Sequence, residues 1–384
     1  MRVTMVNKYY APHLGGVESH LHDLAEGLVK YEDAQVRALV CNAVNERAEE
    51  TMGGVEVVRL PRAAELSSTP ISWGFARELA KEARRDPAPD VFHFHFPYPW
   101  GEIAWLTARP DVPCVVSYHS DIVRQKAAFA AYRPLMERFL DAADLIIAGS
   151  PNMIEHSPYL AARKDKCRHV DYGLHVDRTA HNPAAISRAV ELRAAHRGRK
   201  IVLFVGRLVY YKGADVLVKA MESIDADLVM VGRGPLESEL REVATARGIE
   251  SRVTFLHPLD DTELAAWYHA ADVFCLPSVA RSEAFGLVQI EAHSAGTPVV
   301  STELTTGVPY ANLDGVTGLT VPVGNVDALS GALRRLLSDD ELRARLGAQA
   351  QERALRDFTI PRMAASALAV YQEAIERHSA RTGA

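Results

Sequence analysis

Short apolar segments rich in β-branched residues alternate with amphipathic helical patterns along most of the chain, and this alternation most constrains its fold. The apolar segments include "RVTMVN", "QVRALVCN", "DLIIAGS", "KIVLFVG" and "DVFCLPS". Continuous apolar strands between helices are typical of parallel sheets that helices cover on both faces. We therefore predict a doubly wound α/β fold.

The same arrangement occurs twice along the chain. Each half begins with an apolar strand, a glycine-containing loop and an amphipathic helix, with Gly15 and Gly16 in the first loop and Gly206 and Gly213 in the second. A chain of 384 residues also suits two domains of roughly 170 to 190 residues better than one core. Ligands of open parallel sheets bind beyond the carboxyl ends of the strands. We therefore predict two Rossmann-like, doubly wound parallel-sheet domains that face a cleft.

The predicted domain boundary is the segment 177–200, which is polar, rich in Ala and Arg, and without strand character. We interpret it as a linker between an N-terminal domain, residues 1–176, and a C-terminal domain, residues 201–357. A turn at Pro361 and a last helix follow. We expect residues 358–384 to cross back toward the N-terminal domain.

The composition indicates a soluble globular protein, with 48% apolar and 24% charged residues. The net charge of −6 gives no reason to expect nucleic-acid binding. The sequence contains neither a run of 18 apolar residues nor a signal peptide, so a cytoplasmic location is expected. The four cysteines are scattered and form no CxxC motif, which favours reduced core thiols over disulfides or a zinc ribbon.

Two glutamates, Glu283 and Glu291, lie eight positions apart in "SEAFGLVQIE". If Gly286 to Ala295 is helical, a rise of about 1.5 Å per residue separates them by about 12 Å along the axis. That is too far for a glycosidase pair, in which both carboxylates reach one anomeric carbon. The spacing fits an elongated ligand held at two points, with a phosphate near the N–H groups of the helix start. A capping carboxylate followed by a solvated one explains the pattern equally well.

Two cations follow the first strand of the second half, in "VGRLVYYKG". Arg207 and Lys212 beside a helix start would form a clamp for a diphosphate, because Arg offers a planar fork and Lys a mobile point charge. The alternative is a pair of solvated surface cations. The nearby "VGRGPL" supplies Gly232 and Gly234 but lacks the third glycine of GxGxxG, so it is a weak dinucleotide fingerprint.

Together, "GRLVYYKG", "VGRGPL" and "SEAFGLVQIEAHSAGTPVVST" resemble the family 4 retaining glycosyltransferases of the GT-B fold. The signature of that family is Glu, seven residues, Glu, and the resemblance to bacterial mannosyl- and rhamnosyltransferases covers nearly the whole chain. It implies that Glu283 lies beside the donor sugar and that Glu291 binds the ribose hydroxyls. It further implies that the backbone of Phe285, Gly286 and Leu287 faces the diphosphate, which Arg207 and Lys212 neutralise as it leaves.

The resemblance also implies roles for the first domain. Gly15 and Gly16 match the glycine-rich loop that approaches the donor phosphate, and His119 in "SYHSD" matches a histidine near the reacting face of the sugar. We expect the acceptor pocket to be lined by His95, Tyr98, Trp100 and Asp121, with the rings of Tyr98 and Trp100 as platforms on which a sugar stacks.

A metal site is not expected. His93 and His95 in "HFHF" point the same way on a strand and suggest zinc together with His119. No carboxylate or cysteine at ligand spacing completes such a site. His20 and His22 lie on a helix with one polar face, and we interpret them as solvated.

The predicted reaction is transfer of a hexose, with GDP-mannose the favoured donor, to an acceptor hydroxyl in glycan, glycolipid or glycoside biosynthesis. The resemblance implies retention through front-face attack, without a metal or another cofactor. The alternatives are a UDP-hexose donor such as UDP-glucose or UDP-GlcNAc, a GT-B phosphorylase or epimerase, and a non-catalytic sugar-binding module. An NAD-dependent oxidoreductase would need a complete GxGxxG.

A basic amphipathic surface helix is conceivable from Asp121 to Arg138, although Pro134 would kink it. The negative net charge limits membrane contact to a weak peripheral association at the inner face, because each cation near an anionic leaflet contributes only about 1 kcal/mol. The segment contains Arg124, Lys126, Arg133 and Arg138 among Ile122, Val123, Phe129, Tyr132, Leu135 and Met136.

Overall fold

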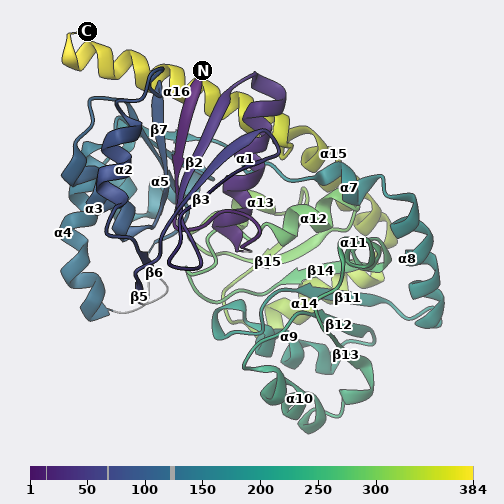
Figure 1. Cartoon of the computed structure of the whole chain (residues 1–384). Helices are drawn as coiled ribbons and strands as arrows, with labels where there is room; N and C mark the ends of the chain where they lie inside the picture. The colour runs from purple at the N-terminus through teal and green to yellow at the C-terminus, as the bar shows by residue number, and fades with distance from the viewer. Residues whose placement is uncertain (14, 67–68, 122–125, 384) are drawn as a thin grey trace. The chain divides into compact units, whose positions relative to one another are not determined.

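The computed structural model describes residues 1–13, 15–66, 69–121 and 126–383, except for the side chains of 126–128. The chain divides into two units (Figure 1). Unit 1 comprises Met1–Gly173 and Ile360–Ala384, and unit 2 comprises Leu174–Thr359. Each is an α/β unit built on a parallel sheet, as the alternating pattern predicts.

Unit 1 contains an eight-stranded sheet in the order β10-β9-β8-β7-β1-β2-β4-β3. Its strands are β1 (Arg2–Val6), β2 (Gln35–Cys41), β3 (Ala48–Met52), β4 (Val55–Leu60), β7 (Val91–Phe96), β8 (Cys114–Tyr118), β9 (Leu145–Ala148) and β10 (Cys167–His169). Only β3 is antiparallel to its neighbour among these pairs. A separate hairpin joins β5 (Ala64–Leu66) to β6 (Thr69–Ile71).

The helices of unit 1 are α1 (Gly16–Glu32), α2 (Phe75–Glu82), α3 (Pro99–Ala108), α4 (Lys126–Ala142), α5 (Pro151–His156), α6 (Pro158–Ala161) and α16 (Ile360–Thr382). Successive side chains of β7 face opposite sides of the sheet, as strand geometry requires. His93 contacts Tyr371 of α16, whereas Phe94 packs on Trp105 of α3.

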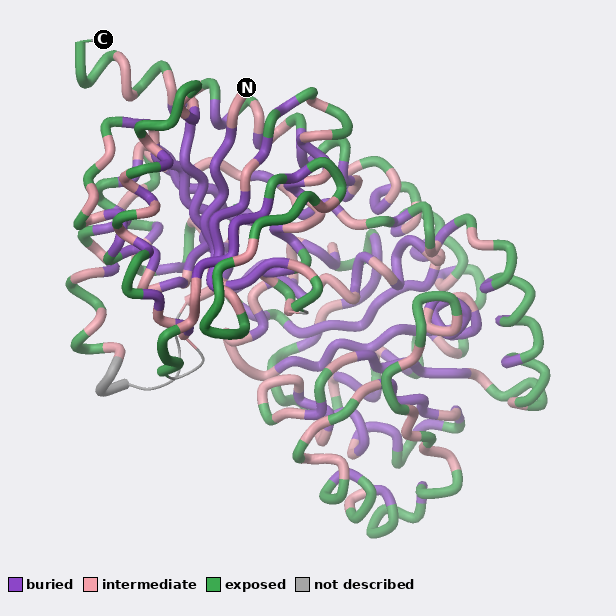
Figure 2. The backbone as a smooth tube through the Cα atoms, viewed as in Figure 1, coloured by how far each residue is buried: buried purple, intermediate pink, exposed green. Residues whose placement is uncertain are grey.

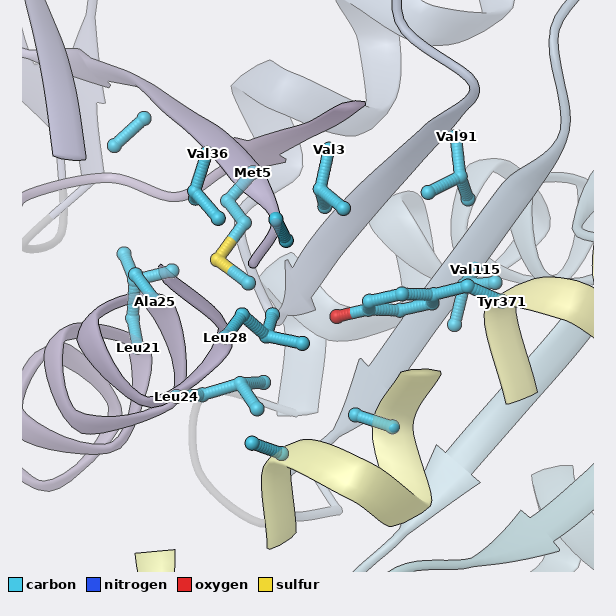
Figure 3. Packing of buried hydrophobic residues seen from close by; sticks show 14 of the residues in the cluster. Val3, Met5, Leu21, Leu24, Ala25, Leu28, Val36, Val91, Val115 and Tyr371 are labelled. Atoms are coloured by element: carbon cyan, nitrogen blue, oxygen red, sulfur yellow. The ribbon is translucent and has the colours of Figure 1, made fainter. Parts of the chain in front are cut away.

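The core between the sheet, α1 and α16 is apolar and closely packed (Figure 3). Leu21, Leu24 and Leu28 of α1 lie in one cluster with Met5 of β1, and Tyr371 of α16 lies near Val115. Gly27 permits this approach, because a Cβ there would lie 2.7 Å from Cγ2 of Ile360. Figure 2 shows the same pattern, with buried strands and helices that are exposed on their outer faces.

Unit 2 contains a six-stranded parallel sheet in the order β13-β12-β11-β14-β15-β16. Its strands are β11 (Ile201–Val205), β12 (Asp227–Val231), β13 (Val253–Leu256), β14 (Val273–Leu276), β15 (Val299–Thr302) and β16 (Gly318–Val321). Its helices are α7 (Val176–Ala180), α8 (Pro183–Ala195), α9 (Ala214–Ala220), α10 (Glu237–Ala246), α11 (Asp261–Ala270), α12 (Val288–Ser294), α13 (Val308–Ala311), α14 (Val326–Ser338) and α15 (Asp340–Asp357).

The segment 177–200, predicted to be a linker, is mostly helical and part of unit 2. Helix α8 packs on α11 through Ala185, Ala189 and Leu192. Its polar side chains face outward, which explains the linker-like composition. The chain instead passes between the units at 173–174 and 359–360. At these crossings Leu174 and Thr359 are neighbours, joined by a β-bridge.

Each sheet has a point at which the strand order reverses. In unit 1 the chain runs from β1 to β2 on one side and continues with β7 on the other. In unit 2 it runs from β11 to β12 and β13, and then to β14 on the opposite side of β11. Such switch points open a crevice at the carboxyl ends of the two strands, where α/β proteins bind ligands.

None of the helices in the described part of the chain combines the length and apolar character that a bilayer crossing requires.

Candidate active site

A buried ion pair lies at the switch point between β11 and β14. Lys212 follows β11 and Glu283 follows β14, and Nζ of the lysine lies 2.6 Å from Oε2 of the glutamate. Only 11% and 9% of the two side chains is exposed. Ser278 donates a hydrogen bond to the same carboxylate oxygen at 3.0 Å. Because a buried carboxylate needs such partners, the pair fixes Glu283 at the switch point.

Gly213 brings the lysine loop against the end of β14. Its φ is +64°, and a Cβ would lie 2.0 Å from the carbonyl oxygen of Pro277. Both the left-handed backbone and the close approach require glycine. This contact explains why Lys212 reaches a carboxylate on the neighbouring loop.

Glu291 lies on α12 and is bound by a second element. Tyr268 of α11 donates its hydroxyl to Oε2 of Glu291 at 2.6 Å. Burial raises the pKa of Glu291, and the hydrogen bond from Tyr268 partly opposes that rise. The tyrosine therefore orients one carboxylate oxygen and favours the ionised form.

Arg207 lies two residues after the end of β11, and its side chain is exposed. Its loop runs against the loop after β12, where Leu208 donates its N–H to the carbonyl of Arg233 at 3.0 Å. A Cβ on Gly232 would lie 2.0 Å from the oxygen of Gly206, and one on Gly234 would lie 2.2 Å from that of Leu208. These glycines therefore serve backbone packing, which accounts for the incomplete dinucleotide fingerprint.

The two glutamates do not share one helix. Helix α12 begins at Val288, because Gly286 has a φ of +75° and cannot continue a right-handed helix. The axial separation of about 12 Å assumed helical geometry and does not apply. Phe285 is only 3% exposed and packs near Tyr310 and Phe358, so at this position only the backbone is available to a ligand.

In unit 1 the two glycines of the loop after β1 differ. Gly15 precedes α1, and a Cβ there would lie 2.2 Å from Oε2 of Glu18. Gly16 is exposed, and a Cβ there would meet no described atom within 4 Å. Only Gly16 therefore leaves space for a ligand that the protein itself does not fill.

His119 lies in a buried cluster of imidazole rings. Its Nε2 is 3.0 Å from Nδ1 of His95, and its Nδ1 is 3.4 Å from the hydroxyl of Tyr172. Burial lowers the pKa values of His119 and His95 well below the usual range and that of His20 to about 4. The rings are therefore neutral near pH 7.

The expectation that His20 is solvated is wrong. It is 8% exposed and its ring meets that of His119 edge-on, with 5.0 Å between centroids. The polar neighbours of His20 on α1 suggested a solvent-facing side, but the ring turns toward the strand ends. His22 is half-buried, and its Nδ1 lies 3.3 Å from the hydroxyl of Tyr10.

Three histidines could ligate a metal ion, and they differ from the set considered from the sequence. One ring nitrogen from each of His20, His95 and His119 lies within 4.8 Å of the others. His93 is instead held by the hydroxyls of Tyr371, at 2.7 Å, and Ser117, at 2.8 Å. Imidazole nitrogens are good zinc ligands, but an ion here would have to displace the hydrogen bond between His95 and His119.

The residues expected to line the acceptor pocket differ in burial and in the contacts that they make within unit 1. Tyr98 is 2% exposed and packs on Phe75, so the prediction of a stacking platform at Tyr98 is wrong. Trp100 is half-buried and donates its Nε1–H to the carbonyl of Ser72 at 2.6 Å. Asp121 accepts hydrogen bonds from Tyr118 and Ser157 at 2.9 and 2.7 Å.

Trp73, which sequence reasoning missed, is an exposed aromatic residue beside Trp100. It is 73% exposed and follows strand β6 in "TPISWG". No periodic pattern distinguishes it, although a tryptophan directly before a glycine and an amphipathic helix was a possible signal.

The apolar side of α4 is used inside unit 1. Met136, Phe139 and Leu140 are buried, while the exposed Arg133 pairs with Glu137 at 2.8 Å. The prediction of a basic amphipathic surface also involved Ile122, Val123, Arg124 and the side chain of Lys126, which lie outside the described residues.

Comparison with known proteins identifies the family. The model of "Glycosyltransferase Family 4" matches residues 14–178, and that of "Glycosyl transferases group 1" matches residues 191–353. The O-antigen chain mannosyltransferase C of Escherichia coli is 33% identical over 385 residues, covering 99% of this chain and 100% of the relative. The chain belongs to the family 4 glycosyltransferases. The D-rhamnosyltransferase WbpZ of Pseudomonas aeruginosa is 35% identical over 363 residues, covering 94% of this chain and 92% of the relative.

Solved glycosyltransferases share its GT-B fold. The sucrose-phosphate synthase of Thermosynechococcus elongatus superimposes with a TM-score of 0.79 at 23% identity, covering 97% of this chain and 98% of the other. Anabaena Alr3699/HepE in complex with UDP gives 0.76 at 21% identity, with coverages of 97% and 100%. This glycosyltransferase is therefore a hexosyltransferase that uses nucleotide sugars.

Proposed function

We propose that this glycosyltransferase moves a mannosyl group from GDP-mannose to a hydroxyl of a growing glycan, with retention of the anomeric configuration. The observation that carries the proposal is the ion pair of Lys212 and Glu283 at the switch point between β11 and β14. The full-length relatives named for the transfer of mannose and D-rhamnose support the choice of sugar.

In this proposal the ion pair separates when the donor binds, and each side chain takes a new partner. Glu283 accepts hydrogen bonds from the sugar hydroxyls, and Lys212 turns to the diphosphate. Arg207, which is exposed after the same strand, adds a second cation, and the backbone from Phe285 to Leu287 faces the phosphates. These charges stabilise the diphosphate as its bond to the sugar breaks.

The acceptor hydroxyl attacks the anomeric carbon from the face that the diphosphate leaves. The bond from the acceptor oxygen to this carbon forms, the bond from the carbon to the phosphate oxygen breaks, and the departing phosphate takes the hydroxyl proton. The protein mainly positions the two reactants and stabilises the developing charge. Gly16 gives the donor room, and neutral His119, held by His95 and Tyr172, is a fixed group near the reacting face.

Glu291 binds the ribose. A carboxylate accepts hydrogen bonds from two hydroxyls most strongly when it is ionised, because both oxygens then act only as acceptors. Tyr268 favours that form in a buried position. We expect Glu291→Ala to weaken the binding of the free nucleotide, whereas Glu283→Ala lowers turnover. Equal loss of nucleotide affinity in both variants would contradict this division.

The test is donor hydrolysis by the whole protein with GDP-mannose, GDP-rhamnose, UDP-glucose and UDP-GlcNAc. We expect GDP release from GDP-mannose to be fastest, and Glu283→Gln to abolish it. Faster turnover of a UDP-hexose would establish the alternative donor. Sugar phosphate formed from a glycan and inorganic phosphate would indicate a phosphorylase, and NMR of the glycoside product reports retention or inversion.

We further propose that the reaction needs no metal, because the protein's cations take its place at the diphosphate. Activity should survive EDTA. Elemental analysis of the purified protein should accompany the assay, since an ion held by His20, His95 and His119 could resist the chelator. Loss of activity in EDTA, restored by magnesium or manganese, would refute the proposal.

Any membrane contact is proposed to be weak and electrostatic, because Met136, Phe139 and Leu140 of α4 pack inward. Co-sedimentation with anionic vesicles should occur only at low salt. Binding that persists at physiological salt would contradict this expectation, and no binding at low salt would indicate a fully soluble acceptor.

A further inference from the structure

A cavity lies at the carboxyl edge of the unit 1 sheet. It has a volume of about 510 Å³ and is lined, among others, by Asn45, Arg47, Trp73, Arg77, Glu78 and Lys81. We call it the Trp73 pocket. Its volume falls within the range of about 300 to 1,000 Å³ that is common for small-molecule sites.

The strands that lead to the Trp73 pocket place it on the ligand-binding edge. Leu60, the last residue of β4, lines the pocket, and Asn45 follows the end of β2. Strands β2 and β4 are parallel neighbours, and β2 lies beside β1. The pocket therefore opens at the same edge of the sheet as the loop of Gly15 and Gly16.

The side chain of Trp73 is exposed to solvent, and its ring contacts that of Trp100. Its ring is 73% exposed and meets that of Trp100 edge-on, with centroids 5.3 Å apart and planes at 81°. Trp100 is anchored by its hydrogen bond to the carbonyl of Ser72, the residue before Trp73. An aromatic ring that is exposed yet fixed is well suited to stack on the apolar face of a ligand.

The polar groups around Trp73 include cations, Arg77 among them, and the carboxylate of Glu78, and a ligand rich in hydroxyls can bind both kinds of group. Arg47 already pairs with Glu49 at 2.6 Å and with Glu78 at 2.9 Å, and Lys81 lies 3.4 Å from Glu78. Glu78 supplies carboxylate oxygens and Asn45 both a donor and an acceptor. A phosphate would have to compete with a carboxylate already in place, whereas hydroxyls can bind both kinds of group.

We propose that the Trp73 pocket binds a sugar residue of the acceptor glycan, at a distance from the residue that receives the new sugar. The inference rests on the proposed function and extends it: the acceptor is an oligosaccharide or longer glycan, recognised by its chain. A short acceptor that fills only the reaction site would gain nothing from the pocket.

The experiment compares wild type, Trp73→Ala and Trp73→Phe with α-mannotriose and methyl α-mannoside as acceptors. Trp73→Ala should raise the KM for mannotriose roughly tenfold, which corresponds to about 1.4 kcal/mol, because tryptophan is enriched among the residues that contribute most to binding. Its kcat, its donor hydrolysis and its KM for the methyl glycoside should stay unchanged, and Trp73→Phe should recover part of the loss. Tyr31→Ala is the matched control. Tyr31 is an aromatic residue of the same unit that is 46% exposed and lies near the C-terminal end of α1.

Two results would overturn the proposal: an unchanged KM for mannotriose, or an equal loss with both acceptors. Binding is also measured without turnover, by the tryptophan fluorescence of wild type and Trp73→Phe titrated with mannotriose or inorganic phosphate. A response to phosphate alone would refute a sugar site. If wild type hydrolyses no donor but Trp73-dependent fluorescence responds to mannotriose, the proposed reaction fails and the sugar site stands.

Discussion

The hydroxyl of Tyr268 offers a sharp test of the role assigned to Glu291. Tyr268→Phe removes only the oxygen that lies 2.6 Å from Oε2 of Glu291, in a side chain that is 1% exposed. Hydrogen bonds to charged groups contribute about 1.5 to 3 kcal/mol. If nucleotide binding depends on this carboxylate, the variant should bind GDP roughly 10- to 100-fold more weakly near pH 6.

The pH dependence of GDP binding distinguishes the loss of this hydrogen bond from a general loss of structure. Burial raises the pKa of Glu291 and the hydrogen bond from Tyr268 lowers it, so the substitution raises the pKa further. Because the ribose needs the ionised form, affinity is lost as the pH falls through that pKa and recovers above it. The defect in Tyr268→Phe should therefore shrink as the pH rises.

Isothermal titration with GDP at pH 6, 7 and 8.5 measures this effect. Tyr371→Phe is the control, because Tyr371 is also buried and bonds to His93 at 2.7 Å in unit 1. It should lose stability but not affinity. Unchanged affinity of Tyr268→Phe at pH 6, or a loss of equal size at every pH, would refute the reasoning.

Three further predictions concern other residues. Gly16→Ala should leave the melting temperature unchanged or raise it, since no described atom lies within 4 Å of the added Cβ, yet lower donor hydrolysis at least tenfold; normal hydrolysis would remove Gly16 from the donor site. Burial raises the pKa of Glu102 from 4.5 to about 7, so its contribution to stability is complete below pH 4.5 and is lost as the pH rises through 7. Urea unfolding at pH 4.5 and 8 should show that Glu102→Gln removes a pH dependence of roughly 3 kcal/mol. Lys212→Met should lower the free energy of unfolding by about 3 to 5 kcal/mol, because it leaves Glu283 buried without its cation. Adding Glu283→Gln should restore stability but not activity. A double variant that remains equally unstable would contradict the ion-pair explanation.

The sequence predicts the fold because that information is local. Apolar strands, glycine loops and amphipathic helices recur at regular intervals, and each of the predicted halves contains a sheet whose strands are parallel except for β3. The family signature likewise selected Lys212 and Glu283, which the structure brings together. Their pairing with each other was not visible in the sequence, because it depends on the order of β11 and β14 in the sheet.

The wrong predictions all depend on contacts distant in the chain or on a single backbone angle. His20 is buried by His95, His119 and Tyr172, which its polar helical neighbours do not reveal. The start of α12 is fixed by the positive φ of Gly286. The mistaken linker at 177–200 hides a narrow apolar face made mostly of alanines, which a composition argument overlooks.

The two crossings of the chain set an order in which the protein can be completed during synthesis. Unit 2 is a continuous segment whose ends, Leu174 and Thr359, are neighbours. All of its residues are therefore available for folding as soon as Thr359 leaves the ribosome. Unit 1 begins first but finishes last, because its core includes Met363 and Tyr371 of α16. Until those residues emerge, the apolar face of α1 has no cover from α16, and the nascent N-terminal half depends on the last 25 residues of the chain, Ile360–Ala384.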